Sequence, residues 1–553
     1  MYEIAPSKHV KKSTAIVVCL VFTMICAGCG KESEKNEYPL GRAHFAISGS
    51  AEAQQEFNRA VVLLHHMTYP QARAAFKHVA ELDSNCAMAH WGIAMTLFQP
   101  LWPTRPGPKE LQQGWEAVQR AKALAAPTER ERLFIAATEA FFLEPAAKNY
   151  WERIRRWEKA METLYNKFPE DHEVAAFYAL AHLATAPSGG SSLDHQNLSA
   201  KIALSIHAEN PIHPGSIHYL IHANDVRGRQ HESLDIVRSY NNIAPRNPHA
   251  LHMPTHIFTR LGNWDEVIAG NINAAAAALE HPAGDKGQYV WDEYPHALEY
   301  LLYAYLQKGA DEMAAEKLAL LHAIENLHPT FKTAFNLSSM SVRYALERKS
   351  WEEAAALIPR ANKALAWDRF LWPEAISWFA RGLGAAHLGQ YEDAKRAHAR
   401  LQALENTADK MGEKLFTRQI RVLRLAVDAW IAQFQGKSEH ALMQMKAAAE
   451  LEFSTRKHPV TPGPNLPSIE LLGEMLMEQG KPDNALAAFK RSLQLYPKRF
   501  NSILGAARAA RALEDTKMAK SYYAELLKIC VPESKRAGLQ EARTYAGRLE
   551  SRE

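Results

Sequence analysis

Apolar residues recur at helical spacing along almost the whole chain from about residue 50 onward. The alternation of apolar and polar residues that is typical of half-buried strands is nearly absent. Glycine or proline interrupts the helical pattern roughly every fifteen to twenty residues, which marks turns. The pattern therefore predicts an all-α chain in which one helix-turn-helix unit follows another.

The clearest internal repeat lies near the C-terminus. Ala485 and Phe489 are followed by Ala519 and Tyr523 at the same mutual spacing, one repeat length further along the chain. Together with Pro497, these residues resemble the tetratricopeptide repeat, in which a small residue lets two helices approach, an aromatic ring fills the gap and proline ends the second helix. The resemblance implies an α-solenoid whose hairpins stack into a right-handed superhelix with a concave groove.

The position of the small residue in this repeat can be located along the rest of the chain. It marks about twelve units over residues 46–553. The anchors are unequally spaced, which implies insertions in several repeats. Two insertions contain a Pro-Gly-Pro turn, at 102–108 and 458–464, and these loops either fold over the groove or decorate the surface. The anchors are Ala72, Ala117, Trp157, Ser199, Ser233, Val267, Ala314, Ala354, Ala394, Ala441, Ala485 and Ala519.

The composition is that of a protein that folds in water. Hydrophobic residues make up 47% of the 553 residues and charged residues 23%, which excludes a mostly disordered or polytopic membrane chain. The net charge is only +4, too little to indicate a nucleic-acid partner. We therefore expect no nucleic acid among the partners.

The first thirty residues have the features of an export signal. Lysines within residues 8–12 precede an apolar stretch at 15–25, which is too short to span a bilayer comfortably. The sequence at 26–29, Cys-Ala-Gly-Cys, resembles a bacterial lipobox, which implies cleavage before Cys29 and lipid on that cysteine. Gly30, where aspartate would favour the inner membrane, points to an outer-membrane lipoprotein that faces the periplasm. A plain signal peptide or an uncleaved anchor is the alternative.

This interpretation divides the chain into a signal peptide at 1–28, a lipidated cysteine with a solvated tether at 29–45, and the repeats at 46–553. After cleavage Cys86 and Cys530 are the only cysteines besides Cys29. Two cysteines do not form a disulfide framework, even though an oxidising compartment would permit one.

Histidines are concentrated in one part of the chain, with eleven of the 25 between residues 195 and 296. His218 and His222 are four residues apart and share one helix face, and His252 and His256 form the same pair in the next repeat. The tetratricopeptide resemblance implies that both pairs line the groove at matched positions of consecutive repeats. Pro254 interrupts the second pair and should kink its helix.

The segment 213–303 is therefore the candidate site. Its imidazoles would donate or accept hydrogen bonds from a ligand, and Arg260 would bind a carboxylate. The candidate ligand-binding residues are His218, His222, Asp225, His249, His252, His256, Arg260, His296, Glu299 and Tyr303.

Three interpretations of this segment remain open. The first is a polar ligand pocket without a metal, the second a metal site, and the third packing alone. In the metal interpretation zinc or copper is held by His218, His222, His252 and His256, and Glu299 or Asp225 acts as a further ligand or general base.

Several sequence segments resemble those of a family of bacterial tetratricopeptide proteins with no assigned activity. These segments are 86–94, 213–225, 249–266 and 294–307. The usual motifs of zinc proteases, phosphate-binding loops, esterases and thiol redox enzymes are absent. We therefore expect an envelope lipoprotein that binds a partner peptide, a partner protein or a small polar ligand in its groove. A metal-binding protein or metal-dependent hydrolase and a pure assembly scaffold are the alternatives.

Overall fold

The structure is a computed structural model that describes residues 39–102, 105–144, 150–188, 192–284 and 286–550. Residues 39–550 belong to one compact unit. The predicted signal peptide at 1–28, the lipidated Cys29 and the tether as far as residue 38 lie outside the described residues. None of the described helices combines the length and apolar composition needed to cross a membrane.

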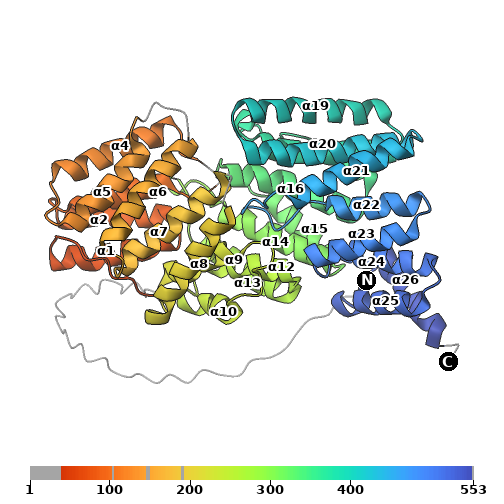
Figure 1. Cartoon of the computed structure of the whole chain (residues 1–553), viewed down its shortest axis with the longest axis horizontal. Helices are drawn as coiled ribbons and strands as arrows, with labels where there is room; N and C mark the ends of the chain where they lie inside the picture. Colours follow the sequence, from red (N-terminus) through yellow and green to blue (C-terminus); the bar gives the residue numbers. More distant parts are fainter. Residues whose placement is uncertain (1–38, 103–104, 145–149, 189–191, 285, 551–553) are drawn as a thin grey trace, which may run out of the picture. The chain divides into compact units, whose positions relative to one another are not determined.

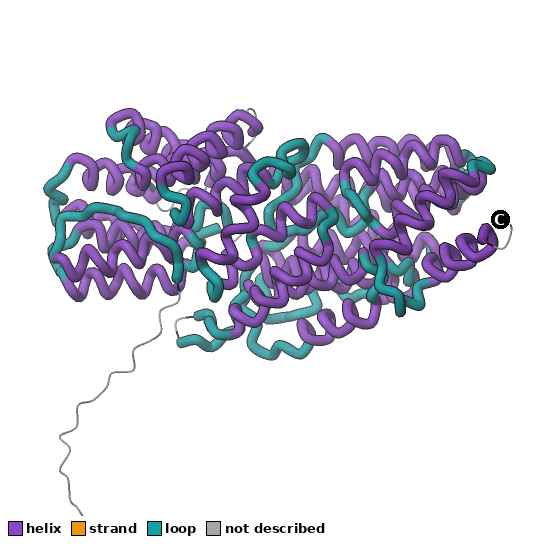
Figure 2. The backbone as a smooth tube through the Cα atoms, turned by 90° about the horizontal axis from the view of Figure 1, so that it is seen from below, coloured by secondary structure: helices purple, strands orange, loops and turns teal. Residues whose placement is uncertain are grey.

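The described part of the chain consists of helices and loops, with two isolated β-bridges and no strand (Figure 2). Consecutive helices pair into hairpins from α1 and α2 to α24 and α25, and α26 follows (Figure 1). The helices are α1 (Ala51–His65), α2 (Tyr69–Leu82), α3 (Ala87–Phe98), α4 (Pro108–Ala123), α5 (Glu129–Phe142), α6 (Tyr150–Lys167), α7 (His172–Thr185), α8 (Ser192–Glu209), α9 (Pro214–Asn224), α10 (Leu234–Ile243), α11 (Pro248–His252), α12 (Pro254–Leu261), α13 (Trp264–Leu279), α14 (Glu293–Gln307), α15 (Asp311–His322), α16 (Phe331–Glu347), α17 (Trp351–Ala356), α18 (Leu371–His387), α19 (Tyr391–Lys410), α20 (Lys414–Phe434), α21 (Ser438–Phe453), α22 (Ser468–Glu478), α23 (Pro482–Leu495), α24 (Phe500–Ala512), α25 (Thr516–Ile529) and α26 (Ala537–Glu550).

The predicted all-α repeat architecture is confirmed. Eleven of the twelve anchors lie in the second helix of a hairpin, as Ala485 does in α23 and Ala519 in α25. The exception is Ser233, which is the N-cap of α10 and adopts a left-handed φ of 58°. Its repeat has an irregular turn between α9 and α10, which shortens the second helix.

The compact unit begins before the predicted boundary at residue 46, because residues 39–45 of the expected tether pack into it. Phe45 is fully buried, and its ring centroid lies 5.1 Å from that of Trp91 and 4.7 Å from that of Phe134. The backbone N–H of Arg42 donates to the carbonyl of Ile212 at 3.0 Å. A segment without helical pattern therefore still contributes to the core of the first repeats.

Pro254 divides the first helix of the sixth hairpin as predicted. α11 ends at His252, and α12 begins at Pro254. Proline has no backbone N–H to donate to a carbonyl of the preceding turn, so the helix breaks at Met253. His252 and His256 thus lie on either side of this break.

Described residues of both Pro-Gly-Pro loops lie against the first helices of the hairpins, the side that the tetratricopeptide resemblance assigns to the groove. In the first loop the ring of Trp102 lies 5.7 Å from His249 and 3.6 Å from the Nζ of Lys332 on α16. In the second loop the carbonyl of Pro464 accepts a hydrogen bond from Arg343 on α16 at 2.7 Å. Of the two alternatives left open for these loops, the structure therefore favours covering of the groove around the histidine segment.

Residues on either side of the twelfth hairpin also contact the sixth and seventh hairpins. The indole N–H of Trp264 donates to the carbonyl of Lys498 at 3.0 Å, and the N–H of Val531 donates to the carbonyl of Lys308 at 2.9 Å. These contacts join parts of the chain that are far apart in the sequence and hold them around the histidine segment.

Candidate functional site

Six histidines from the first helices of three consecutive hairpins form two neighbouring groups of three. Triad A consists of His218 and His222 from α9 and His249 from α11, and triad B of His252 from α11, His256 from α12 and His296 from α14. In each triad one ligand atom per residue lies within 4.8 Å of the others. The four histidines predicted to form one metal shell are thus divided between two groups.

The two triads repeat the same arrangement. Each takes its first two histidines from one repeat, one helical turn apart, and its third from the next repeat. The third histidines, His249 and His296, occupy the same position relative to the anchors of their repeats, Val267 and Ala314. The site is therefore a product of repeat geometry, because equivalent positions of adjacent first helices face each other.

The triads are buried, whereas the resemblance implied imidazoles that line a groove and point at a ligand. Five of the six side chains are buried, with His218 fully enclosed and His249 the most accessible at 8%. His222 is half-buried. The covering loops and the packing of adjacent first helices account for this burial.

The hydrogen bonds of triad B determine which nitrogen carries the proton. The Nδ1 of His252 lies 2.7 Å from Oδ1 of Asn271, whose own amide nitrogen donates to the carbonyl of Val267 at 2.8 Å. Asn271 therefore presents its oxygen, and His252 must donate from Nδ1. The Nδ1 of His256 lies 3.2 Å from the carboxylate of Asp225, which also only accepts. A neutral imidazole has one N–H, so both Nε2 atoms carry lone pairs.

These two lone pairs face each other, because the Nε2 atoms of His252 and His256 are only 3.0 Å apart. Burial lowers the pKa of His256 to about 4 and that of His252 well below its usual range, so both rings are neutral at neutral pH. Two facing lone pairs repel unless a cation lies between them. An Nδ1 held by an acceptor and a free Nε2 is the arrangement found at histidines that bind metals.

In triad A, His218 has the same arrangement. The Nδ1 of His218 lies 2.6 Å from the backbone carbonyl of His65, which only accepts, so its Nε2 is free of hydrogen. That Nε2 is 3.2 Å from the Nε2 of His222 and 3.2 Å from the Nε2 of His249. The Nδ1 of His249 lies 3.2 Å from the carboxylate of Glu293. The Nε2 atoms of His222 and His249 thus both lie 3.2 Å from that of His218.

The carboxylates beside the triads are each matched by a cation. Asp225 binds Arg260 and lies 2.8 Å from the Nζ of Lys457, and Glu293 lies 2.7 Å from the Nζ of Lys332. Although burial opposes ionisation, Arg260 and Lys457 hold the pKa of Asp225 well below its usual range. Both carboxylates are therefore ionised acceptors and leave no excess negative charge at the triads.

A third histidine group is different, because its hydrogen bonds are complete. Glu173 accepts from the Nε2 atoms of His65 at 2.8 Å and His213 at 3.1 Å. The remaining nitrogen of His65 lies 2.8 Å from the hydroxyl of Tyr219, and that of His213 accepts from the N–H of Ser216 at 3.1 Å. No unpaired nitrogen faces another here, so this group is a closed hydrogen-bond network.

The other predicted site residues lie around the triads. Asp225, Arg260 and Tyr303 line a cavity of about 250 Å³. Glu299 is fully buried outside both triads, where its carboxylate accepts from Ser339 at 2.6 Å, and burial raises its pKa to about 7. Glu299 therefore belongs to neither group of potential metal ligands.

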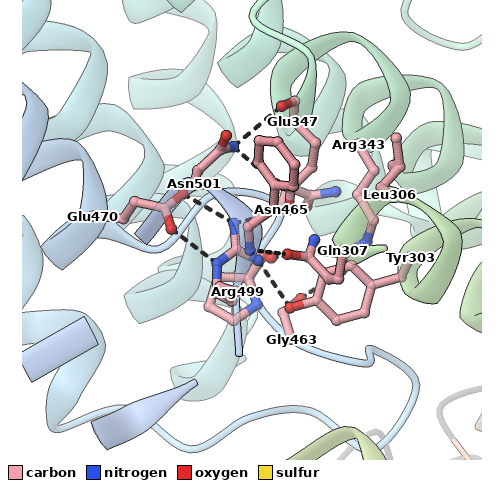
Figure 3. Close-up of polar contacts among 12 residues, drawn as sticks. Tyr303, Leu306, Gln307, Arg343, Glu347, Gly463, Asn465, Glu470, Arg499 and Asn501 are labelled. Carbon is pink, nitrogen blue, oxygen red and sulfur yellow. Dashed lines mark hydrogen bonds and ion pairs between the residues drawn. The ribbon is translucent and has the colours of Figure 1, made fainter. Parts of the chain in front are cut away.

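A buried polar network fixes the second Pro-Gly-Pro loop at one side of this cavity (Figure 3). Arg499 binds both oxygens of Glu470 at 3.0 Å and donates to the hydroxyl of Tyr303 at 2.9 Å. Arg343 donates to the backbone of Gly463, and the amide of Asn465 donates to Ser339. The cavity wall is thus held by residues from α14, α16 and the N-cap of α24.

The fold and the site define this chain as an all-helical protein of stacked helical hairpins with two buried three-histidine groups. No family model matches the chain, and no curated protein matches it.

Solved structures resemble it weakly. A chain of the APC/C hetero-tetramer Cut9-Hcn1 is 14% identical with a TM-score of 0.29, and the match covers 90% of this chain and 96% of that one. A chain of the human IFIT1 dimer with m7Gppp-AAAA is 12% identical with a TM-score of 0.36, covering 87% and 96%. Sequence identities and TM-scores this low do not indicate a shared function, so the function is inferred from the residues of this chain.

Proposed function

We propose that the protein binds two transition-metal ions, zinc or copper, one at each triad. The observation that carries this proposal is the 3.0 Å separation of the Nε2 atoms of His252 and His256, each with its Nδ1 bonded to an acceptor. Metal–nitrogen bonds of ~2.0–2.1 Å require ligand nitrogens about 3.3–3.6 Å apart. The His252–His256, His218–His222 and His218–His249 pairs, at 3.0–3.2 Å, need to open by only a few tenths of an ångström to fit such an ion.

The chemistry of the ligands limits which ion fits. Imidazole nitrogens suit zinc and copper, whereas magnesium and calcium prefer oxygen. Three protein nitrogens leave a fourth position on a tetrahedral ion, and they also complete a trigonal site for monovalent copper. Because Asp225 and Glu293 are already matched by cations, a monovalent ion adds less uncompensated charge than a divalent one.

Cobalt(II) provides a direct test of the coordination, because tetrahedral cobalt absorbs visible light strongly. Titration of the metal-free protein with cobalt should produce these bands. His218→Ala should remove the contribution of triad A, and His252→Ala that of triad B. The matched control is His172→Ala, since this half-buried residue lies in neither triad and bonds to Glu209. A protein that develops no bands, or variants that keep them, would contradict the proposal.

The site supports binding better than hydrolysis. The two carboxylates that could act as general bases, Asp225 and Glu299, lie within ion-pair distance of Arg260 and Arg343, respectively. Arg260 and Lys457 keep the pKa of Asp225 low, which makes it a weak proton acceptor. Glu299, whose pKa burial raises to about 7, belongs to neither triad.

A second candidate function is the binding of a small ligand in the groove. The cavity of about 250 Å³ supports it, because Asp225, Arg260 and Tyr303 of the predicted site line this space. Its size suits a small molecule better than a peptide segment.

We also propose that the chain is a lipoprotein of the bacterial outer membrane, anchored through Cys29 with its repeats in the periplasm. The lipobox-like sequence at 26–29 and the compact unit that begins at Pro39 support this location. Cys29→Ser should move the protein from the membrane fraction to the soluble fraction of cell lysates. A variant that stays in the membrane fraction would contradict lipid attachment at this residue.

A further inference from the structure

The cavity beside triad B has an excess of positive charge on its wall. Four of its lining side chains are cationic, namely Arg227, Arg260, Arg456 and Lys457. Asp225 binds two of them, Arg260 and Lys457, with a single carboxylate. The remaining acid in the wall is Glu452, whose oxygens accept from Ser468 and Tyr496.

Arg227 and Arg456 have no carboxylate within ion-pair distance among the described residues. A guanidinium nitrogen of Arg456 donates to the hydroxyl of Ser192 at 2.7 Å, and Arg227 stacks on the ring of Phe453 at 4.1 Å and donates to its carbonyl at 3.3 Å. These are neutral partners, and each guanidinium keeps further N–H groups for other acceptors. Burial lowers the pKa of Arg456 to about 10, which leaves it charged at neutral pH.

One further polar group in the wall has no partner. The side chain of Thr259 is buried, at 6% exposure, and its hydroxyl makes no hydrogen bond with any described residue. A buried hydroxyl without a hydrogen-bond partner costs free energy. We therefore expect a polar atom of a ligand bound in the cavity to pair with this hydroxyl.

The rest of the wall is apolar and aromatic, with Trp264, Tyr303, Trp372 and Leu466 among the lining residues. The wall is also rigid on the side of the second Pro-Gly-Pro loop, because Arg343 and Asn465 tie this loop to α16 (Figure 3). A preformed cavity saves the ordering cost of binding.

We propose that this cavity binds a small organic anion, with its carboxylate or phosphate group against Arg227 and Arg456 and its apolar body against the aromatic wall. The proposal deepens the second candidate function and does not depend on the metal triads. Planar guanidinium groups bind either type of anion through paired hydrogen bonds.

The test uses four probes that share a phenyl body, namely phenylacetate, phenyl phosphate, 2-phenylethanol and phenethylamine. Binding to the full chain in detergent is measured by calorimetry and by the fluorescence of Trp264 and Trp372. At least one anion should bind ten or more times as tightly as the alcohol, and the amine should bind most weakly. The stronger of the two anions identifies the head group. Added salt should weaken the anion more than the alcohol.

Arg227→Gln together with Arg456→Gln should weaken binding of the anion at least tenfold and leave the alcohol unchanged. The control is Arg491→Gln, because Arg491 lies near the same Phe453 ring but does not line the cavity. Equal affinity for anion and alcohol, or an equal loss in the control, would overturn the anionic class while leaving a ligand cavity in place. Failure of every probe to bind would overturn the cavity function as well. Metal content, measured on the same samples, reports separately on the triads.

Discussion

Asn271→Leu tests whether the triads are organised as metal sites, because Asn271 touches triad B without being able to coordinate its ion. Asn271 is fully buried on α13 and accepts the Nδ1–H of His252 at 2.7 Å. Leucine has a similar volume but no acceptor. The imidazole of His252 then loses the bond that keeps the lone pair on Nε2.

The expected loss follows from what such supporting bonds contribute elsewhere. Removing an outer partner of a metal-bound histidine lowers metal affinity by about 10- to 100-fold, which is ~1.4–2.7 kcal/mol. The metal-free protein should also lose about 1–3 kcal/mol of stability, since the buried Nδ1–H has no other acceptor. Triad A has no contact with Asn271 and should keep its affinity.

The assay is a competition titration with a chromophoric zinc chelator, fitted with two sites per chain. The matched control is Asn336→Leu. Asn336 is also fully buried and holds the same position relative to the anchor Ala354 as His249 and His296 hold to theirs, but its amide has no hydrogen-bond partner among the described residues. This variant should keep both affinities. Unchanged zinc affinity in Asn271→Leu would refute the tautomer reasoning.

Three further predictions concern the fold. Arg499→Met should destabilise the protein by about 3–5 kcal/mol in denaturant unfolding, because it leaves the buried carboxylate of Glu470 without its partner; a loss below about 1 kcal/mol would contradict the network. Phe45→Ala should cost about 3–5 kcal/mol, whereas a residue in a free tether would cost nothing measurable. Stability should fall as pH drops from about 6.5 towards 3, because burial lowers the pKa of His66 and His458 to about 3 while the unfolded chain ionises near 6.5. Each such histidine removes about 2 kcal/mol between pH 6.5 and 5, so urea midpoints that do not change in this range would be the contrary result.

The sequence was sufficient to predict the hairpins, because repeats of this kind make mainly local contacts. Small residues at a regular spacing mark where two helices approach closely, and Ala485 and Ala519 are both fully buried where they do. The same spacing placed the anchor of the fifth repeat at Ser233, which lies at the N-cap of α10 and not inside the second helix. A turn of variable length between α9 and α10 leaves no periodic signal.

The pairing of His218 with His222 and of His252 with His256 was also predictable, since four residues make about one helical turn. Their division into two triads was not predicted, although the sequence contains the signal. His249 and His296 occupy the same position in consecutive repeats. In each repeat this position lies three residues before the one that holds His252 in the sixth hairpin and Glu299 in the seventh. Reading the same position in successive repeats would have supplied the third member of each triad.

Contacts between distant repeats lay beyond prediction. Neither the packing of Trp102 on His249 nor the bond from Arg499 to Tyr303 follows from local spacing, because each depends on how far the stacked hairpins curve. For the same reason the sequence left open whether the Pro-Gly-Pro loops cover the groove. Covering the groove changes the site from an exposed surface into a buried one.

The most direct test of the central claim is the metal content of untagged protein by mass spectrometry, after exposure to zinc or to copper under reducing conditions followed by dialysis. Two equivalents of one of these metals per chain are expected. His218→Ala and His252→Ala should each retain one, the double variant none, and the control His440→Ala two. Protein that binds no metal under either condition, or a double variant that still binds two equivalents, would contradict the claim that the triads are metal sites.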